Sequence, residues 1–230
     1  MSAIAERAKA ALRGAIPRSL LVRRLPGAAA ANAVLLTFDD GPHPEVTPAV
    51  LDRLAAHRAR AVFFIVGKRI RRAPHLLDRI QREGHVIGNH SLLHRAGYVR
   101  AENGRTPTFT EYYRDCVRCQ AVLERRAGRR PTLFRPPGGR LTPTSVVVPK
   151  LIGLSCMTWS IEVQDWAFRS AEQAQAGARR LIDGIQPRDI VLLHDDNRFV
   201  VDLLDAALPA LTAKGFDLAS GIETVGSEQG

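Results

Sequence analysis

From residue 33 onward, short apolar runs alternate with longer stretches of helical periodicity, and this alternation constrains the fold more than any other feature of the sequence. The apolar runs lie between turn signals and contain few polar residues, which is typical of parallel strands buried on both faces. The predicted strands are Ala33–Phe38, Ala61–Val66, His85–Gly88, Thr132–Arg135, Leu154–Ser160, Asp189–His194 and Phe216–Ala219. The predicted helices are Pro44–His57, Arg69–Gly84, Thr110–Gly128, Thr142–Gly153, Ala171–Ile185 and Arg198–Gly215. Seven strands separated by six helices indicate an α/β domain with a parallel sheet.

The size and composition of the chain agree with one globular domain. Its 230 residues can bury a sizeable core, and 45% of them are hydrophobic and 24% charged. The sequence has no run of 18 apolar residues and no segment with the layout of a signal peptide, so we expect a cytoplasmic protein, with the inner membrane face as an open alternative. Cys116 and Cys119 lie within a helical pattern without a second pair nearby, which favours helix thiols over a zinc ribbon.

Residues 1–30 differ from the rest of the chain and are predicted to form a basic N-terminal arm, followed by the folded domain at 31–230. The arm carries six basic residues against the single acid Glu6, and the whole chain has a net charge of +10. An amphipathic helix here would make peripheral contact with an anionic membrane surface; the alternative is a helix that caps the domain or a frayed terminus. No nucleic-acid-binding signature accompanies the charge, so no nucleic acid is expected as a partner. The oligomeric state is not set by any feature of the sequence.

Ionisable residues stand at or just after the ends of five predicted strands. They are Asp39, Asp40, His90, Arg135, Asp165 and His194. In parallel α/β folds the carboxyl ends of the strands share one rim, where ligands bind. We therefore expect these side chains, which are far apart in the sequence, to form one site.

The adjacent carboxylates of Asp39 and Asp40 suggest a cation at this rim. Neighbouring carboxylates at a buried strand end repel each other, and a nearby cation removes that penalty. Adjacent strand residues point to opposite faces, so the turn at Gly41–Pro42 must redirect one of the two side chains. One aspartate can then bind metal while the other acts as a base. The alternative is a simple turn with two solvated acids.

Two histidines, His90 and His94, are predicted to fall on one face of a helical turn and to bind one cation. With one aspartate they provide two nitrogens and one oxygen, a set that suits zinc or another borderline divalent metal. His194 ends a buried strand and can protonate a leaving amine. Each histidine could instead have a purely structural role, as a hydrogen-bonded core residue, a surface residue or a helix cap.

Five short motifs follow one another at these strand ends. They read Thr37-Phe38-Asp39-Asp40-Gly41-Pro42, His90-Ser91-x-x-His94, Arg135-Pro136-Pro137-Gly138, Asp165-Trp166 and Leu192-Leu193-His194. Together they resemble the motifs of polysaccharide deacetylases, the NodB-homology group also called carbohydrate esterase family 4, from residue 34 to about residue 220. The resemblance implies a distorted (β/α) barrel of seven or eight strands. It also implies a metal-dependent hydrolase that removes acetyl groups from the N-acetylated sugars of an oligo- or polysaccharide.

The resemblance implies a role for each matched residue. Asp39 would be the general base, paired with Arg135, and His194 would be the general acid, paired with Asp165. Asp40, His90 and His94 would bind a divalent metal, in the first place zinc, with cobalt, nickel and manganese as alternatives. The substrate-binding residues would be Pro137, Gly138, Trp166 and Leu192. Gly138 and Gly139 stand where the family often has an aromatic residue, which predicts a more open cleft. The family also often carries another acid just before Asp-Trp; here the nearest one is Glu162, and Asp165 is taken as the partner of His194.

Two other functions remain open at this stage. An esterase that removes O-acetyl groups from xylan or a similar glycan would use the same catalytic set, and a non-catalytic glycan-binding domain would use the same scaffold. The partner in each case is a glycan: chitin oligomers, peptidoglycan, an exopolysaccharide and a lipid-linked precursor all fit the motifs.

Overall fold

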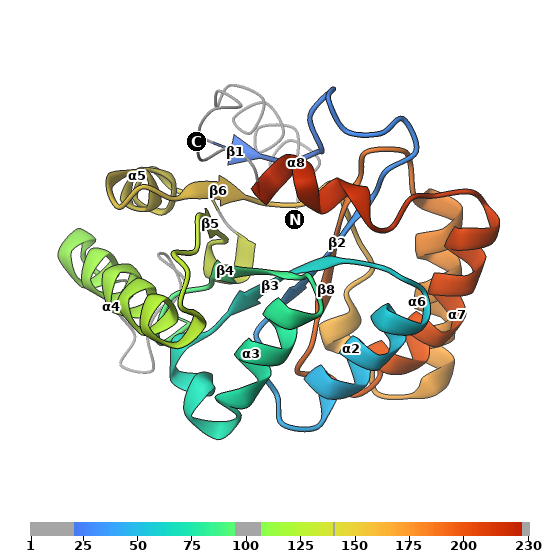
Figure 1. The fold of residues 1–230 in the computed structure, drawn as a ribbon, viewed down its shortest axis with the longest axis horizontal. Coiled ribbons are helices and arrows are strands. Elements are labelled where there is room, and N and C mark those ends of the chain that lie inside the picture. The colour runs from blue at the N-terminus through green and yellow to red at the C-terminus, as the bar shows by residue number, and fades with distance from the viewer. Residues whose placement is uncertain (1–20, 95–106, 140, 227–230) are drawn as a thin grey trace, which may run out of the picture.

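In the computed structural model, residues 21–94, 107–139 and 141–226 are described, and they form one parallel sheet surrounded by helices (Figure 1). The strands are β1 (Leu21–Val22), β2 (Leu35–Asp39), β3 (Ala61–Ile65), β4 (Val86–Asn89), β5 (Leu133–Phe134), β6 (Ser155–Met157), β7 (Ile161–Glu162) and β8 (Ile190–His194). Their order in the sheet is β1-β6-β5-β4-β3-β2-β8-β7, and every pair of neighbours is parallel. The predicted α/β fold with a distorted barrel is confirmed, with eight strands in place of about seven.

Buried residues on both faces of the central strands explain why those strands are apolar throughout. Alternate side chains enter two separate core clusters, so that Leu36 and Phe63 belong to one and Leu35 and Phe64 to the other. The first and larger cluster lies between the sheet and the helices. The second fills the concave side of the sheet.

The two edges of the curved sheet are joined by one short segment. β6 and β7 are consecutive in the chain, yet β6 pairs with β1 and β5 whereas β7 pairs with β8 at the other end. Between them, the Thr158 amide donates to the Val22 carbonyl at 2.8 Å and the Ser160 amide donates to the Ile190 carbonyl at 3.0 Å. The predicted single strand Leu154–Ser160 is therefore wrong in extent, because the chain leaves one edge there and crosses to the other.

The predicted strand Phe216–Ala219 is also wrong. Only one isolated bridge forms there, between Ala33 and Asp217. The Asp217 carboxylate then accepts hydrogen bonds from the amides of Ala219 and Ser220. This local turn ends the extended backbone and starts η4 (Ser220–Ile222), which is followed by α8 (Glu223–Gly226).

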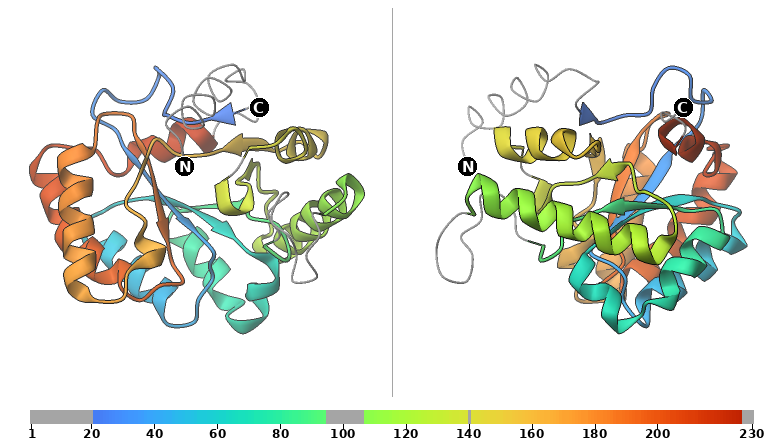
Figure 2. Two further views of the ribbon diagram at one scale, coloured as in Figure 1. Left: turned by 180° about the vertical axis from the view of Figure 1, so that it is seen from behind. Right: turned by 60° about the vertical axis from the view of Figure 1, so that its left-hand side comes forward.

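The helices lie around the outside of the sheet, as the two further views show (Figure 2). They are α2 (Val46–Ala56), α3 (His75–Arg82), α4 (Phe109–Ala127), α5 (Pro143–Leu151), α6 (Ala171–Gly184) and α7 (Val200–Ala213). The predicted helix Arg69–Gly84 is divided into η1 (Gly67–Arg72) and α3, because Pro74 disfavours helical backbone at Ala73, whose φ is −153°. No helix of the described ranges is long and apolar enough to cross a membrane.

The described part of the predicted arm packs on the domain. Leu21 and Val22 form β1, and Leu25 and Ala29 are buried in the concave core cluster beside Ile222. The guanidinium of Arg24 lies 2.8 Å from the Asp189 carboxylate. Residues 1–20, on which most of the predicted basic arm and its membrane contact fall, lie outside the described residues.

Two glycines of α6 give a test of this packing. A Cβ at Gly177 would overlap the ring of buried Phe168, whereas a Cβ at Gly184 would lie 3.4 Å from Ile161 Cδ1. We expect Gly177→Ala to lower the free energy of unfolding relative to Gly184→Ala by about 1–3 kcal/mol, the usual cost of overpacking a core. Urea denaturation of the two variants measures the difference. Equal stabilities would contradict the close packing of α6 on Phe168.

Candidate active site

Asp39 ends strand β2, Asp40 follows it, and both carboxylates point to the same place. Asp40 has a φ of +74°, a left-handed conformation that aspartate tolerates better than most residues. This backbone turn redirects the second side chain, as the sequence required. Asp39 Oδ2 and Asp40 Oδ1 lie 3.6 and 3.7 Å from the same atom, His90 Nε2.

His90 and His94 follow strand β4 and bring their rings to this point. The ring centroids are 5.0 Å apart, and His94 Nε2 lies 2.8 Å from Asp40 Oδ1. The predicted helical turn is wrong: residues 90–94 form a bend in which Ser91 and His94 have φ values of 65° and 56°. The Ser91 hydroxyl accepts a hydrogen bond from the His94 amide at 3.0 Å, which holds the bend closed.

A backbone carbonyl sets the orientation of the His90 ring. His90 Nδ1 lies 2.8 Å from the carbonyl oxygen of Arg135 and therefore carries the proton that it donates there. The lone pair of Nε2 is left facing the two aspartates. Burial lowers the pKa of His90, more than the charges of Asp39 and Asp40 raise it, so the neutral ring is favoured.

Asp40, His90 and His94 form a set of donor atoms that fits a divalent metal. One donor atom from each residue lies within 4.8 Å of the other two, and this is the one such group among the described residues. Asp40 Oδ1 is buried, and His94 Nε2 lies 2.8 Å from it. Burial alone would raise the pKa of the Asp40 carboxyl. The hydrogen bond from His94 and the charges of His90 and His94 outweigh burial and hold that pKa well below its usual value. An ionised carboxylate and two imidazoles are ligands that zinc and similar cations prefer.

Arg135 holds Asp39 from the opposite side. Its side chain is 0% exposed, and Nη1 donates to Asp39 Oδ1 and to the Thr37 hydroxyl, both at 2.7 Å. The other nitrogens donate to the carbonyls of Met157 at 3.3 Å and Thr158 at 3.0 Å. The guanidinium therefore fixes Oδ1 of Asp39, while Oδ2 lies 3.6 Å from His90 Nε2.

His194 ends strand β8 directly beside Asp39, its partner in the sheet register. Its Nδ1 lies 2.9 Å from Asp165 Oδ1, and its backbone amide donates to Asp165 Oδ2 at 2.7 Å. Burial alone would lower the pKa of His194, but the hydrogen bond to Asp165 and the charges of Asp165, Asp39 and Asp40 raise it to about 9. The ring is thus protonated at neutral pH and can donate that proton.

The four predicted substrate-binding residues lie on three elements near these groups. Pro137 and Gly138 form a short turn, η2 (Pro137–Gly139), just after Arg135, and Pro137 is buried. Trp166 follows Asp165 and is 54% exposed, so its ring is accessible from solvent. Leu192 is buried and shares one face of β8 with His194. Their contact with substrate stays a prediction.

Several supporting residues were not found from the sequence. Arg69 Nη1 donates to the Asp40 carbonyl at 2.5 Å and lies 2.8 Å from Asp196. Asp195 is fully buried under the turn at Gly41 and accepts a hydrogen bond from the Thr47 hydroxyl at 2.5 Å. Burial raises the pKa of Asp195 to about 7. Its place directly after His194 was the one signal in the sequence; Arg69 and Thr47 gave none.

Comparison with known proteins supplies the family. The family model for polysaccharide deacetylases matches residues 27–157. The chain belongs to the polysaccharide deacetylase family. The matched span contains Asp39, Asp40, His90, His94 and Arg135, whereas Asp165 and His194 lie beyond it.

Three similar proteins show the range of this family. A peptidoglycan-N-acetylglucosamine deacetylase, PgdA of Listeria monocytogenes, is 32% identical over 93% of the chain, which spans 43% of its length. The chitooligosaccharide deacetylase of Azorhizobium caulinodans is 34% identical over 81% of the chain and 91% of its own length. The solved structure of a family 4 acetyl xylan esterase from Clostridium thermocellum, in complex with a cobalt ion, superposes with a TM-score of 0.71 at 29% identity, covering 84% of this chain and 90% of that one.

The buried ion pair of this polysaccharide deacetylase family member gives a stability test. Arg135→Met leaves the carboxylate of Asp39 buried without its cation, and we expect a loss of about 3–5 kcal/mol in the free energy of unfolding. Arg53→Met is the matched control, because Arg53 pairs with Asp205 at 3.0 Å on the surface. That variant should lose less than about 1 kcal/mol. Urea denaturation measures both, and equal losses would contradict the structural role of Arg135.

The pairing of His194 with Asp165 predicts a measurable titration. In metal-free protein, the His194 ring should titrate with a pKa of about 9, and Asp165→Asn should lower that pKa because the nearest negative charge is lost. Imidazole resonances followed by NMR from pH 5 to 10 give both values. The pair should stabilise the fold fully below pH 6.5 and lose that contribution as the pH rises through about 9. An unchanged His194 titration in the variant would rule the pairing out.

Proposed function

We propose that this chain is a metal-dependent hydrolase that removes acetyl groups from N-acetylated sugars of a glycan. One observation carries the proposal: an aspartate paired with a cation and a histidine paired with an anion lie beside the same set of metal ligands. Asp39 is held by the cation of Arg135, and His194 is held by the anion of Asp165, at the ends of neighbouring strands. A neighbouring cation keeps the aspartate ionised as a base, and a neighbouring anion keeps the histidine protonated as an acid, so one site holds both.

Asp40, His90 and His94 are the residues proposed to hold the cation, with zinc as the metal that best suits two imidazoles and one carboxylate. A bound divalent cation would polarise the acetyl carbonyl and lower the pKa of the attacking water. Cobalt, nickel and manganese remain alternatives.

Asp39 and His194 carry out the proton transfers of the proposed reaction. Asp39 Oδ2 is free of the arginine and accepts the proton of the attacking water. Addition of that water to the acetyl carbon breaks the C=O π bond and gives a tetrahedral centre. His194 Nε2 then donates its proton to the sugar nitrogen, the C–N bond breaks, and acetate and a free amine leave. The link of Nδ1 to Asp165 orients Nε2 toward the substrate and keeps the ring charged.

Removal of N-acetyl groups is preferred to removal of O-acetyl groups. An amine leaving from a tetrahedral centre needs a proton; burial lowers the pKa of His194, but the hydrogen bond and charge of Asp165 raise it, which favours the protonated ring. The names of the two curated relatives support the same class of substrate. The similarity to an acetyl xylan esterase keeps O-deacetylation as the second candidate.

The test is acetate release from an N-acetylchitooligosaccharide and, in parallel, from acetylated xylan. We expect release from the first substrate, loss of activity with a chelator, and recovery on addition of zinc or cobalt. Asp39→Asn and His194→Ala should each lower kcat by about 10²–10⁴-fold, the usual contribution of one acid or base.

The control variant is His75→Ala, which removes an exposed histidine at the start of α3 and should retain full activity. Retention of turnover after loss of both Asp39 and His194 would refute the mechanism. A metal-loaded protein that binds glycan but releases no acetate would indicate a binding domain instead.

A further inference from the structure

The loop of residues 90–94, here called the histidine loop, carries two of the three proposed metal ligands and is held through its backbone. The amide of Gly67 donates to the Ser91 carbonyl at 3.0 Å. The amide of Lys68 donates to the Leu92 carbonyl at 2.8 Å. These two contacts tie the carbonyls of the loop to the start of η1.

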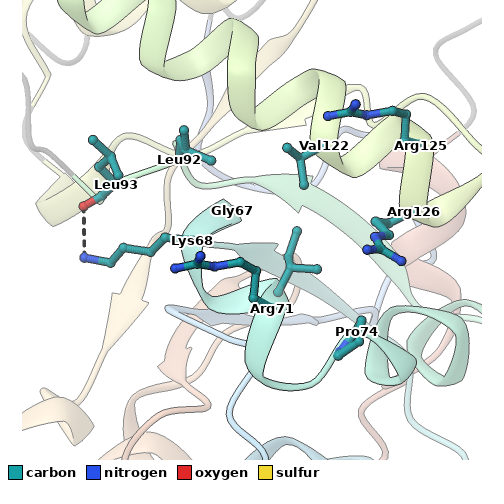
Figure 3. Close-up of a pocket in the computed structure, with 10 residues that line it drawn as sticks. Gly67, Lys68, Arg71, Pro74, Leu92, Leu93, Val122, Arg125 and Arg126 are labelled. Carbon is teal, nitrogen blue, oxygen red and sulfur yellow. Dashed lines mark hydrogen bonds between the residues drawn. The ribbon is translucent and has the colours of Figure 1, made fainter.

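Side-chain packing holds this loop less firmly than it holds the core. Leu92 and Leu93 are partly buried and line an open pocket of about 750 Å³ between η1 and α4 (Figure 3). Lys68 Nζ donates to the Leu93 carbonyl at 3.2 Å at this pocket (Figure 3). Because a segment with few buried apolar contacts opens easily, the conformation of the histidine loop depends on its hydrogen bonds.

Asp115 of α4 accepts the two amides in the middle of the histidine loop. Its Oδ2 accepts hydrogen bonds from the amides of Leu92 at 3.1 Å and Leu93 at 3.4 Å. The residue is 6% exposed, so the amides and their acceptor are shielded from water. A shielded amide without an acceptor is costly, and one carboxylate oxygen removes that cost for both.

The helix that carries Asp115 is fixed to the end of β4 by the side chain of Asn89. Asn89 Nδ2 donates to the Cys116 carbonyl at 3.2 Å and to Gln120 Oε1 at 3.0 Å. Asn89 Oδ1 accepts the Ser91 amide at 2.8 Å. Cys116 directly follows Asp115, so the strand that precedes the histidine loop also sets the place of its acceptor.

The two histidine rings are held in different ways. His90 is buried, and its Nδ1 is fixed by the carbonyl of Arg135. The His94 side chain is 33% exposed, and no hydrogen bond to its Nδ1 occurs within the part of the chain that the structure describes. The backbone of His94 has a φ of 56°, which a residue other than glycine adopts where surrounding contacts impose it. The approach of His94 to Asp40 therefore depends on the backbone of the loop.

We propose that Asp115 is a positioning residue of the metal site. By accepting both middle amides, it holds His94 where its ring can share one cation with Asp40 and His90. The proposal rests on the proposed function in taking these three residues as the metal ligands. Asp115 is not itself one of the ligands, so its loss should act through the position of His94.

Two variants of nearly equal size separate the acceptor from its charge. Asp115→Asn removes the charge but keeps an oxygen for the amides, whereas Asp115→Leu removes both. Competition with a chromophoric chelator gives the zinc dissociation constant of each. We expect Asp115→Asn to stay within about 3-fold of the wild-type value and Asp115→Leu to raise it about 10- to 100-fold, the usual effect of losing a residue that orients a metal ligand.

A loss of stability alone is controlled by Gly177→Ala, which overpacks α6 against Phe168 and leaves the histidine loop untouched. This control should bind zinc as the wild type does. With cobalt in place of zinc, the absorption spectrum of the bound ion should change in Asp115→Leu and remain unchanged in Asp115→Asn and in the control. Wild-type zinc affinity in Asp115→Leu, or an equal loss in Gly177→Ala, would overturn the proposal.

Hydrogen exchange in the metal-free wild type tests the contact even if Asp115→Leu does not fold. The amides of Leu92 and Leu93 should exchange about 10²-fold or more slowly than unstructured amides, and rapid exchange of both would refute the proposal. None of these measurements requires acetate release. A wild type that binds zinc as expected and releases no acetate would therefore contradict the proposed function alone, whereas an active enzyme whose Asp115→Leu variant binds zinc normally would contradict only the role of Asp115.

Discussion

The guanidinium of Arg135 is the constraint on which the rest of the site depends. It is fully buried, and its nitrogens reach Asp39 and Thr37 on β2 and the carbonyls of Met157 and Thr158 where the chain leaves β6. The carbonyl of the same residue orients His90 after β4. Arg135 thus connects Asp39, which is the proposed general base, with His90, which is a proposed metal ligand, and with the segment that joins the two edges of the sheet. A lysine in its place would lack the planar set of donors that makes these contacts at once.

The fold and the rim of functional residues could be predicted because both follow from local patterns. Buried parallel strands are continuous apolar runs, and polar residues at their ends stand out against them. Asp39, His90, Arg135 and His194 were placed at strand ends for this reason, and the structure brings them together. The contacts between them depend on distances across the sheet, which no single segment of the sequence contains.

The features that could not be predicted are those in which a tertiary contact overrides a local pattern. Residues 154–160 read as one strand, but hydrogen bonds to Val22 and to Ile190 draw their two ends to opposite edges of the sheet. His90 and His94 have helical spacing, yet the backbone bends because the Asn89 and Ser91 side chains accept amide hydrogen bonds that a helix would use internally. The two histidines still meet beside Asp40, so the predicted set of metal ligands comes together although the predicted local conformation is wrong.

The separate partners of Asp39 and His194 explain how two neighbouring side chains act as base and acid in the proposed mechanism. Their residues are neighbours in the register of β2 and β8, and an aspartate and a histidine so placed would ordinarily pair with each other and share one proton. Among the described residues they form no ion pair, because Arg135 takes Asp39 Oδ1 and Asp165 takes His194 Nδ1. In the proposed mechanism, Asp39 Oδ2 and His194 Nε2 are the atoms that act on the substrate. In the proposed mechanism, the division into base and acid therefore comes from Arg135 and Asp165, which hold the two groups, rather than from Asp39 and His194 alone.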